Sequence, residues 1–304
     1  MESSYAIEVK GLRKSYGDFE AVKGIDLRVN SGEIFALLGP NGAGKTTTIE
    51  ILEGFLTPNA GSVRVLGYDP AKHERVYKER IGIVLQETEV EEFLSVEESI
   101  RLVRSYYQNP LPLDDVLAVT GLTDLRRVRP RKLSGGQKRR LDVAMGLAGN
   151  PDLLFLDEPT TGFDPQARRD AWDMLRNLRE LGKTVLLTSH YMDEVEHIAS
   201  RAAVMIDGKI VLEGTPQDLA HEAEPTISFR ATANLNLPNG LEAEFHEGDS
   251  QYLISSSDLV KTLYVLTSWA IENNVSLEDL SITRRSLDDA FVELTQRAEN
   301  GQER

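Results

Sequence analysis

GPNGAGKT, at residues 39–46, is the stretch that decides the fold. It fits the pattern G-x-x-x-x-G-K-[ST]. It lies between a predicted buried strand, SGEIFALLG at 31–39, and a predicted helix, TTTIEILEGFL at 46–56. Glycines let backbone N–H groups curl around phosphate oxygens, and the start of the helix adds partial positive charge. We therefore expect a phosphate-binding loop in an α/β fold rather than a turn that binds nothing. The predicted helix has apolar residues at helical spacing, at Ile49, Leu52 and Phe55.

The residues of this loop are candidates for nucleotide binding. Lys45 should reach the β- and γ-phosphates, and the Thr46 hydroxyl should ligate Mg²⁺, with Thr47 one position further along the helix. The loop itself is made of Gly39, Pro40, Asn41, Gly42, Ala43 and Gly44. GTPases, kinases and ATPases all use loops of this kind. The sequence lacks the Asn-Lys-x-Asp tetrad of Ras-like proteins, so that guanine-specific element is missing.

A second apolar run ends in two carboxylates. PDLLFLDEPTTGFD, at 151–164, predicts a buried strand that delivers Asp157 and Glu158 beside the phosphate loop, provided that the sheet is parallel. Adjacent residues of a strand point to opposite sides, so we expect the two carboxylates to differ in role. Asp157 would serve Mg²⁺ through water, and Glu158 would polarise the attacking water. The alternative, a solvated strand end, is disfavoured by the phosphate loop that precedes it.

The motif LSGGQ, at residues 133–137, distinguishes among the classes of phosphate-loop protein. Together with the two stretches above, it resembles the ATP-binding subunits of ABC transporters, over roughly residues 5–220. A second glycine-rich helix start, without a lysine of its own, can add N–H donors and a hydroxyl to a phosphate held elsewhere. In the family that phosphate belongs to a second subunit. The resemblance therefore implies two ATP molecules between two heads, contacted by Ser134, Gly135, Gly136 and Gln137.

Further residues match the short motifs of the family in order. Tyr16 in KSYGD matches the aromatic that stacks on adenine, and Gln86 in VLQET matches the glutamine between the core and the helical segment. Asp164 in TGFD matches the loop that crosses the dimer interface, and His190 in LLTSH matches the switch histidine. The resemblance implies ATP and Mg²⁺ as cofactors, since stacking alone does not separate adenine from guanine. It also implies catalytic roles for Glu158, His190 and Gln86, and metal binding by Thr46, Gln86 and Asp157.

The implied fold class is α/β: a P-loop (RecA-like) ATPase core with an antiparallel β subdomain and a helical subdomain at about 88–150. We place this nucleotide-binding domain at residues 1–224 and a small C-terminal α+β accessory domain at 225–304. The boundary lies near Pro225, where the composition shifts to 6 basic against 13 acidic side chains in the second part. That part predicts strands at 226–231, 251–256 and 279–285, an amphipathic helix at 258–274, and a last helix capped by Ser286.

Composition narrows the class of protein. The 304 residues carry 34 basic and 49 acidic side chains, a net charge of −15, which argues against a nucleic-acid partner because such binding needs a basic face. There is no cysteine, which excludes disulfides and thiolate zinc sites. The first ten residues lack the basic and apolar segments of a signal peptide, and no apolar run approaches the ~18 residues of a membrane-spanning helix. We expect a cytoplasmic protein.

The C-terminal stretch SLDDAFVELT, at 286–295, resembles the tail of bacterial drug, antibiotic and polysaccharide exporter ATPases of the daunorubicin-resistance type. The resemblance implies an ATPase that powers a separate integral membrane permease, an exporter of drugs, antibiotics, lipids or polysaccharide. It would be peripheral on the inner face of the cell membrane and paired with a second ATP-binding head, as a homodimer. One alternative is a soluble ABC-type ATPase without a transport role. Another is a regulatory module that hydrolyses nothing, against which Glu158 and His190 argue.

Two charged runs have two interpretations each. The glutamate-rich ETEVEEFLSVEES, at 87–99, is either a docking surface for the permease or a solvated helix start, and the sequence does not decide. The basic RRVRPRK, at 126–132, could touch lipid head groups or a partner, but a solvated turn is the favoured interpretation.

Overall fold

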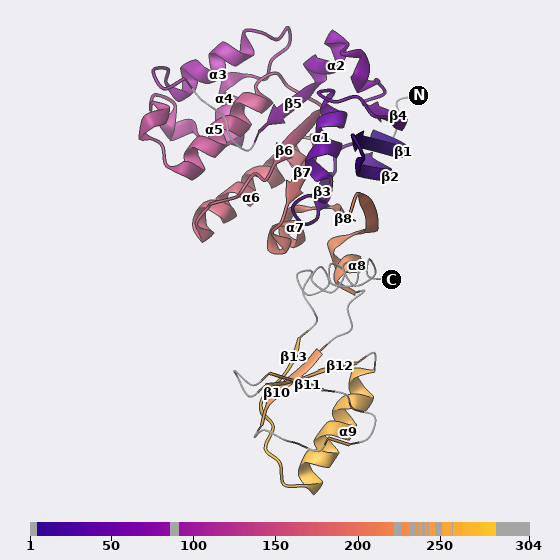
Figure 1. The fold of residues 1–304 in the computed structure, drawn as a ribbon. Helices are drawn as coiled ribbons and strands as arrows, with labels where there is room; N and C mark the ends of the chain where they lie inside the picture. Colours follow the sequence, from indigo (N-terminus) through magenta and orange to yellow (C-terminus); the bar gives the residue numbers. More distant parts are fainter. Residues whose placement is uncertain are drawn as a thin grey trace. The chain divides into compact units, whose positions relative to one another are not determined.

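The computed structural model describes residues 5–85, 91–221, 226–231, 235, 237–238, 241, 243–246, 251–256 and 258–283. Packing divides the chain into two compact units, Met1–Pro216 and Gln217–Arg304; Figure 1 draws the first in indigo to orange and the second in orange to yellow. The predicted boundary at Pro225 lies outside the described residues. The division after Pro216 assigns the short helix α8 (Pro216–His221) almost entirely to the second unit.

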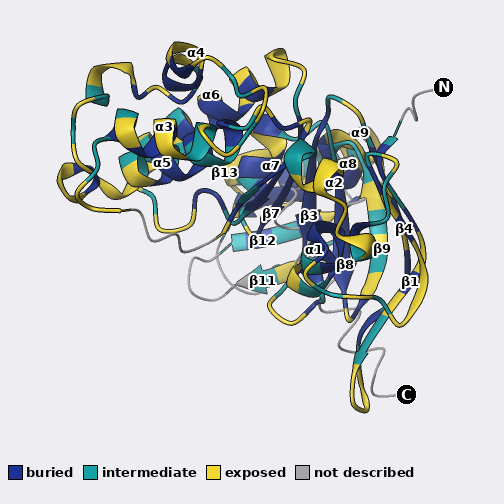
Figure 2. Cartoon of the chain, turned by 90° about the horizontal axis from the view of Figure 1, so that it is seen from above, coloured by how far each residue is buried: buried dark blue, intermediate teal, exposed yellow. Residues whose placement is uncertain are grey.

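A six-stranded sheet forms the centre of the first unit. Its strand order is β5-β6-β7-β3-β8-β9, and all neighbouring strands are parallel except the β8–β9 hairpin. The strands are β3 (Ile34–Leu38), β5 (Ile81–Val84), β6 (Leu153–Asp157), β7 (Thr184–Ser189), β8 (Arg201–Ile206) and β9 (Lys209–Gly214). Every residue of β3 and β7 is buried, which is typical of parallel strands covered on both faces; both strands are dark blue in Figure 2.

A second, three-stranded sheet of the first unit is antiparallel, with strand order β2-β1-β4. Its strands are β1 (Tyr5–Tyr16), β2 (Phe19–Asn30) and β4 (Ala60–Val65). Buried side chains such as Val9 and Leu27 share one apolar core with Phe35 of the parallel sheet and Leu52 of the first helix. The predicted antiparallel β subdomain is confirmed, and its packing places the start of β2 against the phosphate loop.

The helices of the first unit are α1 (Lys45–Glu53), α2 (Arg75–Arg80), α3 (Val96–Arg104), α4 (Leu113–Val119), α5 (Gly135–Leu147), α6 (Pro165–Glu180) and α7 (Met192–Ile198). Short 3₁₀ turns occur at Pro70–Lys72, Thr123–Leu125 and Pro130–Lys132. Helices α3, α4 and α5 share an apolar core of their own, which includes Ile100, Leu117 and Leu141. This cluster forms the helical part of the unit, between β5 and β6 in the sequence.

One detail of the predicted helix after the phosphate loop is wrong. Ile49 and Leu52 are buried as expected, but α1 ends at Glu53, and Phe55 lies beyond the helix with an exposed ring. The reason is Gly54, which takes the left-handed conformation (φ 87°) and caps the helix with its N–H. The apolar periodicity therefore continues past a glycine that ends the helix.

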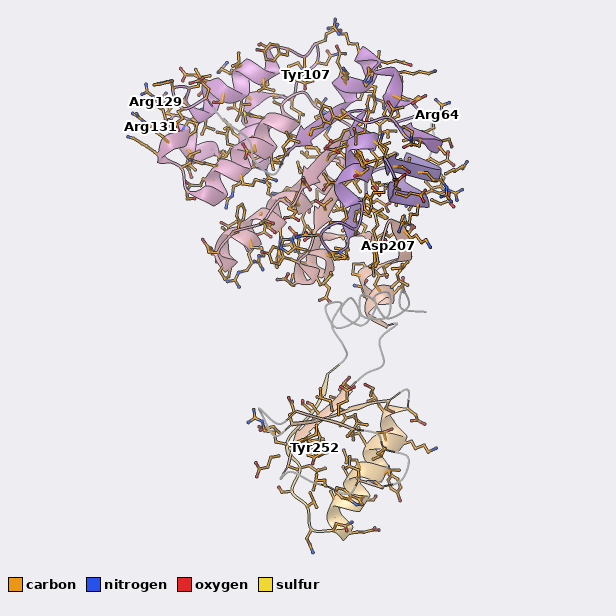
Figure 3. The ribbon with its side chains drawn as sticks, viewed as in Figure 1. Arg64, Tyr107, Arg129, Arg131, Asp207 and Tyr252 are labelled. Carbon is orange, nitrogen blue, oxygen red and sulfur yellow. The ribbon has the colours of Figure 1, made fainter. Side chains whose placement is uncertain are left out.

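The second half of the acidic run forms a helix start. Ser95 caps α3 by accepting a hydrogen bond from the Glu98 N–H, and the Glu98 carboxylate accepts from the Ser95 N–H. Residues 87–90 of the run lie outside the described residues, and a docking role stays a prediction. In the basic run, Arg129 and Arg131 are exposed and point away from the unit in Figure 3.

The second unit is a small α+β structure. Its antiparallel sheet has the strand order β11-β12-β10-β13, with β10 (Thr226–Arg230), β11 (Glu244–His246), β12 (Gln251–Ser255) and β13 (Glu278–Thr283). Helix α9 (Leu259–Glu272) contributes Leu266 to a core in which the rings of Phe229 and Tyr252 stack with centroids 5.2 Å apart; Tyr252 is labelled in Figure 3. The predicted helix capped by Ser286 lies outside the described residues.

Among the helices in the described ranges, none combines the length and apolar character that crossing a bilayer requires.

Candidate nucleotide site

The predicted phosphate loop connects β3 to α1, and two of its glycines are required by close packing. Gly44 caps α1 with a φ of 99°, and a Cβ added there would lie 2.4 Å from the carbonyl oxygen of Ala21. A Cβ added at Gly39 would lie 2.2 Å from the carbonyl oxygen of Met205. A side chain at either position would clash with backbone, so both positions must be glycine for the loop to fit between β2 and β8.

Lys45, the first residue of α1, turns its side chain back over the loop. The residue is 7% exposed, and its Nζ donates hydrogen bonds to the carbonyl oxygens of Gly39 (2.7 Å) and Pro40 (3.1 Å). Burial lowers the pKa of Lys45, while the negative charges of Glu158 and Asp157 raise it. The ammonium group therefore lies inside the loop, facing the two carboxylates, where it can pair with phosphate oxygens.

One threonine fixes both acidic residues. Asp157, the last residue of β6, lies opposite Thr188 of β7 in the parallel pairing. The Thr188 hydroxyl donates to Asp157 Oδ1 at 2.5 Å and accepts from the Glu158 N–H at 3.0 Å. Thr188 is not among the site residues predicted from the sequence. In the sequence, Thr188 is marked by its position two residues before His190. Its contact with Asp157 depends on β7 lying beside β6, which only the strand order shows.

The Glu158 and Asp157 carboxylates point in different directions as predicted, but for a different structural reason. Glu158 lies beyond the end of β6 in the left-handed conformation (φ 44°), so a turn of the backbone, rather than the alternation of a strand, directs the two carboxylates apart. Its Oε2 accepts from the Thr161 hydroxyl at 3.0 Å, and its Oε1 lies 3.3 Å from Nδ1 of His190. A strained backbone that holds a carboxylate beside a histidine is typical of a catalytic position.

Lys45, Asp157 and Glu158 border one cavity of about 430 Å³. It is lined by Tyr16, Phe19, Ala21, Asn41, Gly42, Gly44, Lys45, Thr46, Thr47, Asp157 and Glu158. The structure thus brings the predicted aromatic, the loop and the two carboxylates together. Phe19, an exposed aromatic at the start of β2, is an additional lining residue that the sequence analysis missed; a tight turn joins it to Tyr16. An aromatic wall opposite a phosphate loop suits a purine nucleotide.

The site also fits Mg²⁺. The Thr46 hydroxyl and the Asp157 carboxylate both border the cavity beside the phosphate loop. Both are hard oxygen donors, which Mg²⁺ prefers, and Mg²⁺ at such sites completes its shell with water and substrate phosphates. Gln86, the third predicted metal ligand, lies outside the described residues.

The LSGGQ residues lie in a different hollow, of about 550 Å³. It is lined by Ser134, Gly135, Gly136, Lys138, Arg139, Asp142, Glu158, Thr161, Gly162, Phe163, Asp164 and Ala167. Glu158 is the residue that borders both spaces. Within one chain, therefore, Ser134, Gly135 and Gly136 do not join the lining of the phosphate-loop cavity.

Two helix starts border this second hollow, and each is capped. Ser134 accepts from the Gln137 N–H, and the Gln137 side chain accepts from the Ser134 N–H, so Gln137 serves the cap of α5. Asp164 accepts from the N–H groups of Gln166 and Ala167 at the start of α6. At the start of α5 the cap leaves the N–H groups of Gly135 and Gly136 for an anion, whereas at α6 Asp164 takes the N–H groups of Gln166 and Ala167, and Pro165 has no N–H.

Arg139, on α5, is a further residue that the sequence analysis missed. Its buried guanidinium donates to the carbonyl oxygens of Asp157 (2.6 Å) and Leu85, and it lies 4.0 Å from Asp142. It therefore ties the LSGGQ helix to the strand end that carries the carboxylates and to the residue before Gln86. Its signal in the sequence, a basic residue within a helix after LSGGQ, does not show that the side chain is buried.

A buried carboxyl beneath the site predicts a pH dependence of stability. Burial of Glu53, at the end of α1, raises its pKa from 4.5 to about 8, and the charge of Asp157 adds to the effect. Between these two pH values the folded chain keeps a proton that the unfolded chain has released, so this group lowers stability as the pH rises. We expect the difference in free energy of unfolding, Glu53→Gln minus wild type, to increase by about 3–5 kcal/mol between pH 5 and pH 8.5.

Urea unfolding of both proteins without nucleotide, at each pH, measures this difference. The exposed Glu180→Gln, at the end of α6, is the control and should follow wild type at both pH values. If the difference in free energy of unfolding between Glu53→Gln and wild type is the same at pH 5 and at pH 8.5, Glu53 has an ordinary pKa in the folded chain and the prediction is wrong.

Comparisons with known proteins agree with this geometry. The family model described as ABC transporter matches residues 22–161. Daunorubicin resistance ATP-binding protein DrrA3 of Streptomyces coeruleorubidus is 35% identical over 95% of this chain and 96% of its own length. Nod factor export ATP-binding protein I of Paraburkholderia xenovorans is 41% identical over 70% of this chain and 72% of its own length.

A solved structure shares the fold of the first unit. The ATP-binding cassette MJ0796, in a dimeric post-hydrolysis state bound to ADP and phosphate, superposes with a TM-score of 0.60 and 25% identity. The match covers 69% of this chain and 98% of that one. The P-loop ATPase core predicted from the sequence is confirmed. Since a relative is 35% identical over 95% of the chain, and since the chain carries a phosphate loop, two carboxylates and a capped LSGGQ helix, it belongs to the ABC transporter family as an ATP-binding protein and is an ATPase.

Proposed function

We propose that the chain binds ATP with Mg²⁺ and hydrolyses it to power a separate membrane permease that exports its cargo. The observation that carries the proposal is the pair Glu158–His190, with Oε1 and Nδ1 3.3 Å apart, at the edge of the cavity that Lys45 enters. A carboxylate beside a phosphate site can polarise water, and a histidine beside it can hold that carboxylate in place.

The proposed roles follow from the positions of the residues. Lys45 and the loop N–H groups hold the β- and γ-phosphates, and Tyr16 stacks on the adenine. Thr46 and Asp157 would hold Mg²⁺, with Gln86 as the third ligand that the family resemblance implies. When bound, Mg²⁺ neutralises negative charge on the phosphates. Glu158 orients and polarises the attacking water, and His190 supports Glu158.

The second hollow supports a dimer of two heads. Ser134, Gly135, Gly136 and Asp164 border a space away from the phosphate loop of their own chain. The N–H groups of Gly135 and Gly136 and the hydroxyl proton of Ser134 are not used by the α5 cap and can serve a phosphate on another chain. We propose that a second copy fills this role and that each ATP lies between the phosphate loop of one copy and the LSGGQ of the other. A symmetric pair of this kind is a closed two-fold dimer.

Export is proposed from the relatives. One similar protein is named for daunorubicin resistance and another for Nod factor export, and the first matches over almost the whole chain. We propose an integral membrane permease as the partner, which holds this chain on the inner face of the cell membrane, and a cargo among drugs, antibiotics, lipids or polysaccharide. A soluble ATPase without a transport role is the alternative, and recovery of the chain with its partners separates the two.

The test is recovery of the chain from its host with an affinity tag after solubilisation in mild detergent. We expect a hydrophobic multi-span membrane protein to elute with the chain and Glu158→Gln to elute with the same protein while efflux by the host is lost. A chain recovered without any membrane protein, with full ATPase activity and unchanged efflux after its deletion, would contradict a transport role.

We further propose that residues 225–304 form an accessory domain. The catalytic candidates all lie before residue 200, whereas the second unit has its own core around Leu266 and Tyr252. A chain truncated after Glu224 should therefore bind ATP with unchanged affinity but support less efflux. Calorimetric ATP binding and an efflux assay check this. A truncated chain that fails to bind ATP would place the boundary elsewhere, and one with full efflux would show that the accessory domain is dispensable.

A further inference from the structure

Glu194, on α7, is a buried carboxylate that borders neither cavity. The residue is 1% exposed. Each of its carboxylate oxygens accepts a hydrogen bond from a hydroxyl: Oε1 from Thr160 at 2.9 Å, and Oε2 from Ser189 at 2.6 Å. Both hydroxyls are themselves on buried residues. One side chain therefore joins two segments that are far apart in the sequence.

The two segments are those that carry the proposed catalytic pair. Thr160 is two residues beyond Glu158, and Ser189 directly precedes His190. Ser189 also accepts a hydrogen bond from the Tyr191 N–H at 3.0 Å, so this hydroxyl links the two residues that flank His190. A hydrogen-bonded bridge through Glu194 therefore joins the segments of Glu158 and His190 on their buried side.

A second contact, nearer the surface, joins the segment of His190 to α6, the helix that follows the segment of Glu158. The Arg168 guanidinium of α6 lies 4.3 Å from the ring centroid of Tyr191, and its Nη1 donates to Asp193 Oδ2 at 3.3 Å. The Tyr191 ring in turn packs 4.1 Å from the ring of His190. The loop around His190 is therefore held to α6 by this contact, in addition to the hydrogen bonds that Glu194 accepts.

A buried carboxylate is costly unless it is hydrogen-bonded, because it loses its hydration. Burial raises the pKa of Glu194, and the two hydroxyls oppose this effect. An apolar residue of similar size could fill the same space without that cost. The Glu194 carboxylate is costly to bury, but unlike an apolar side chain it hydrogen-bonds to both catalytic segments. A hydrogen-bonded bridge of this kind is suited to holding the two segments in a fixed arrangement.

We propose that Glu194 is a positioning residue for ATP hydrolysis, which holds Thr160 and Ser189 so that His190 stays in contact with Glu158. This inference rests on the catalytic roles proposed above for Glu158 and His190. Glu194 touches neither nucleotide nor water in this role. Its loss should therefore affect turnover and leave the binding of ATP by the phosphate loop unchanged.

The first experiment compares Glu194→Gln with wild type. The amide keeps the size of the side chain but puts an NH2 donor where one carboxylate oxygen stood, so one of the two hydroxyls loses the acceptor that it now has. We expect kcat for ATP to fall about tenfold, with the KM and the Kd for ATP within twofold of wild type. The matched control is Glu196→Gln, an exposed glutamate on the same helix, which should leave kcat unchanged. An unchanged kcat in Glu194→Gln would overturn the proposal.

The second experiment removes the bridge from its other end. Ser189→Ala should lower kcat to a similar extent at unchanged KM, and the double variant Ser189→Ala/Glu194→Gln should lose little more than Glu194→Gln alone, because both changes break one contact. Losses that multiply would overturn the proposal, as would a loss of ATP affinity in step with kcat. If Glu194→Gln does not fold, a wild-type kcat in Ser189→Ala overturns the proposal on its own.

The failure of this inference is distinguishable from failure of the proposed function. Glu158→Gln is assayed in parallel. Full turnover in Glu158→Gln would remove the catalytic role on which the inference rests. Lost turnover in Glu158→Gln, together with wild-type turnover in Glu194→Gln and Ser189→Ala, would leave the proposed function intact and overturn only the positioning role.

Discussion

Glu158→Gln is expected to lower kcat for ATP hydrolysis by about 100-fold or more, while ATP binding is kept. The change removes the group that polarises the attacking water, and it leaves the phosphate contacts of the loop and Lys45 in place. The amide can still accept from the Thr161 hydroxyl, so the local fold should survive. Steady-state release of phosphate gives kcat, and calorimetry gives the Kd for ATP.

The control for this variant is Glu180→Gln, at the exposed end of α6, which should hydrolyse ATP at the wild-type rate. Equal turnover in Glu158→Gln and wild type would remove Glu158 from the mechanism. A loss of ATP affinity as large as the loss of kcat would show that Glu158 acts in binding instead.

Lys45→Ala is expected to weaken ATP binding by at least about 30-fold, since truncating one partner of a buried charge pair typically costs 2–5 kcal/mol. The Lys45 ammonium lies inside the loop, and its charge opposes those of Asp157 and Glu158. Without it, these carboxylates would face the phosphates with less compensation. Binding of a fluorescent ATP analogue, with thermal melting to check the fold, measures the effect.

Lys72→Ala, at an exposed 3₁₀ turn, removes an equal charge away from the cavity and is the matched control. It should bind ATP as wild type does. Unchanged affinity in Lys45→Ala would contradict the phosphate loop as the nucleotide site.

The parts of the fold that could be predicted from the sequence are those with a local signature. β3 is a continuous apolar run and β7 contains the apolar run Val185–Leu187, which indicates burial, and glycine spacing indicates the loop between β3 and α1. The LSGGQ helix start is likewise local, because a cap involves residues three positions apart. Phe55 was misassigned because a periodic pattern continues through Gly54 while the helix does not.

The parts that could not be predicted depend on strand order and burial. Thr188 supports Asp157 only because β7 pairs with β6, and an apolar run does not say which strand is its neighbour. Arg139 stands in the sequence as one of several basic residues, and its buried contact with Asp157 is a long-range one. Glu194 lies in the seven-residue helix α7, which is too short to show a clear period.

The central claim is that one chain holds half of each ATP site and that a second copy completes it. Size-exclusion chromatography with light scattering on Glu158→Gln, at saturating ATP and Mg²⁺, tests it most directly, since this variant should bind ATP without consuming it. We predict a shift from monomer to dimer, absent without nucleotide and blocked when Ser134→Arg is added, because the arginine fills the hollow that faces the partner's phosphate. A Glu158→Gln protein that binds ATP and stays monomeric would contradict the claim.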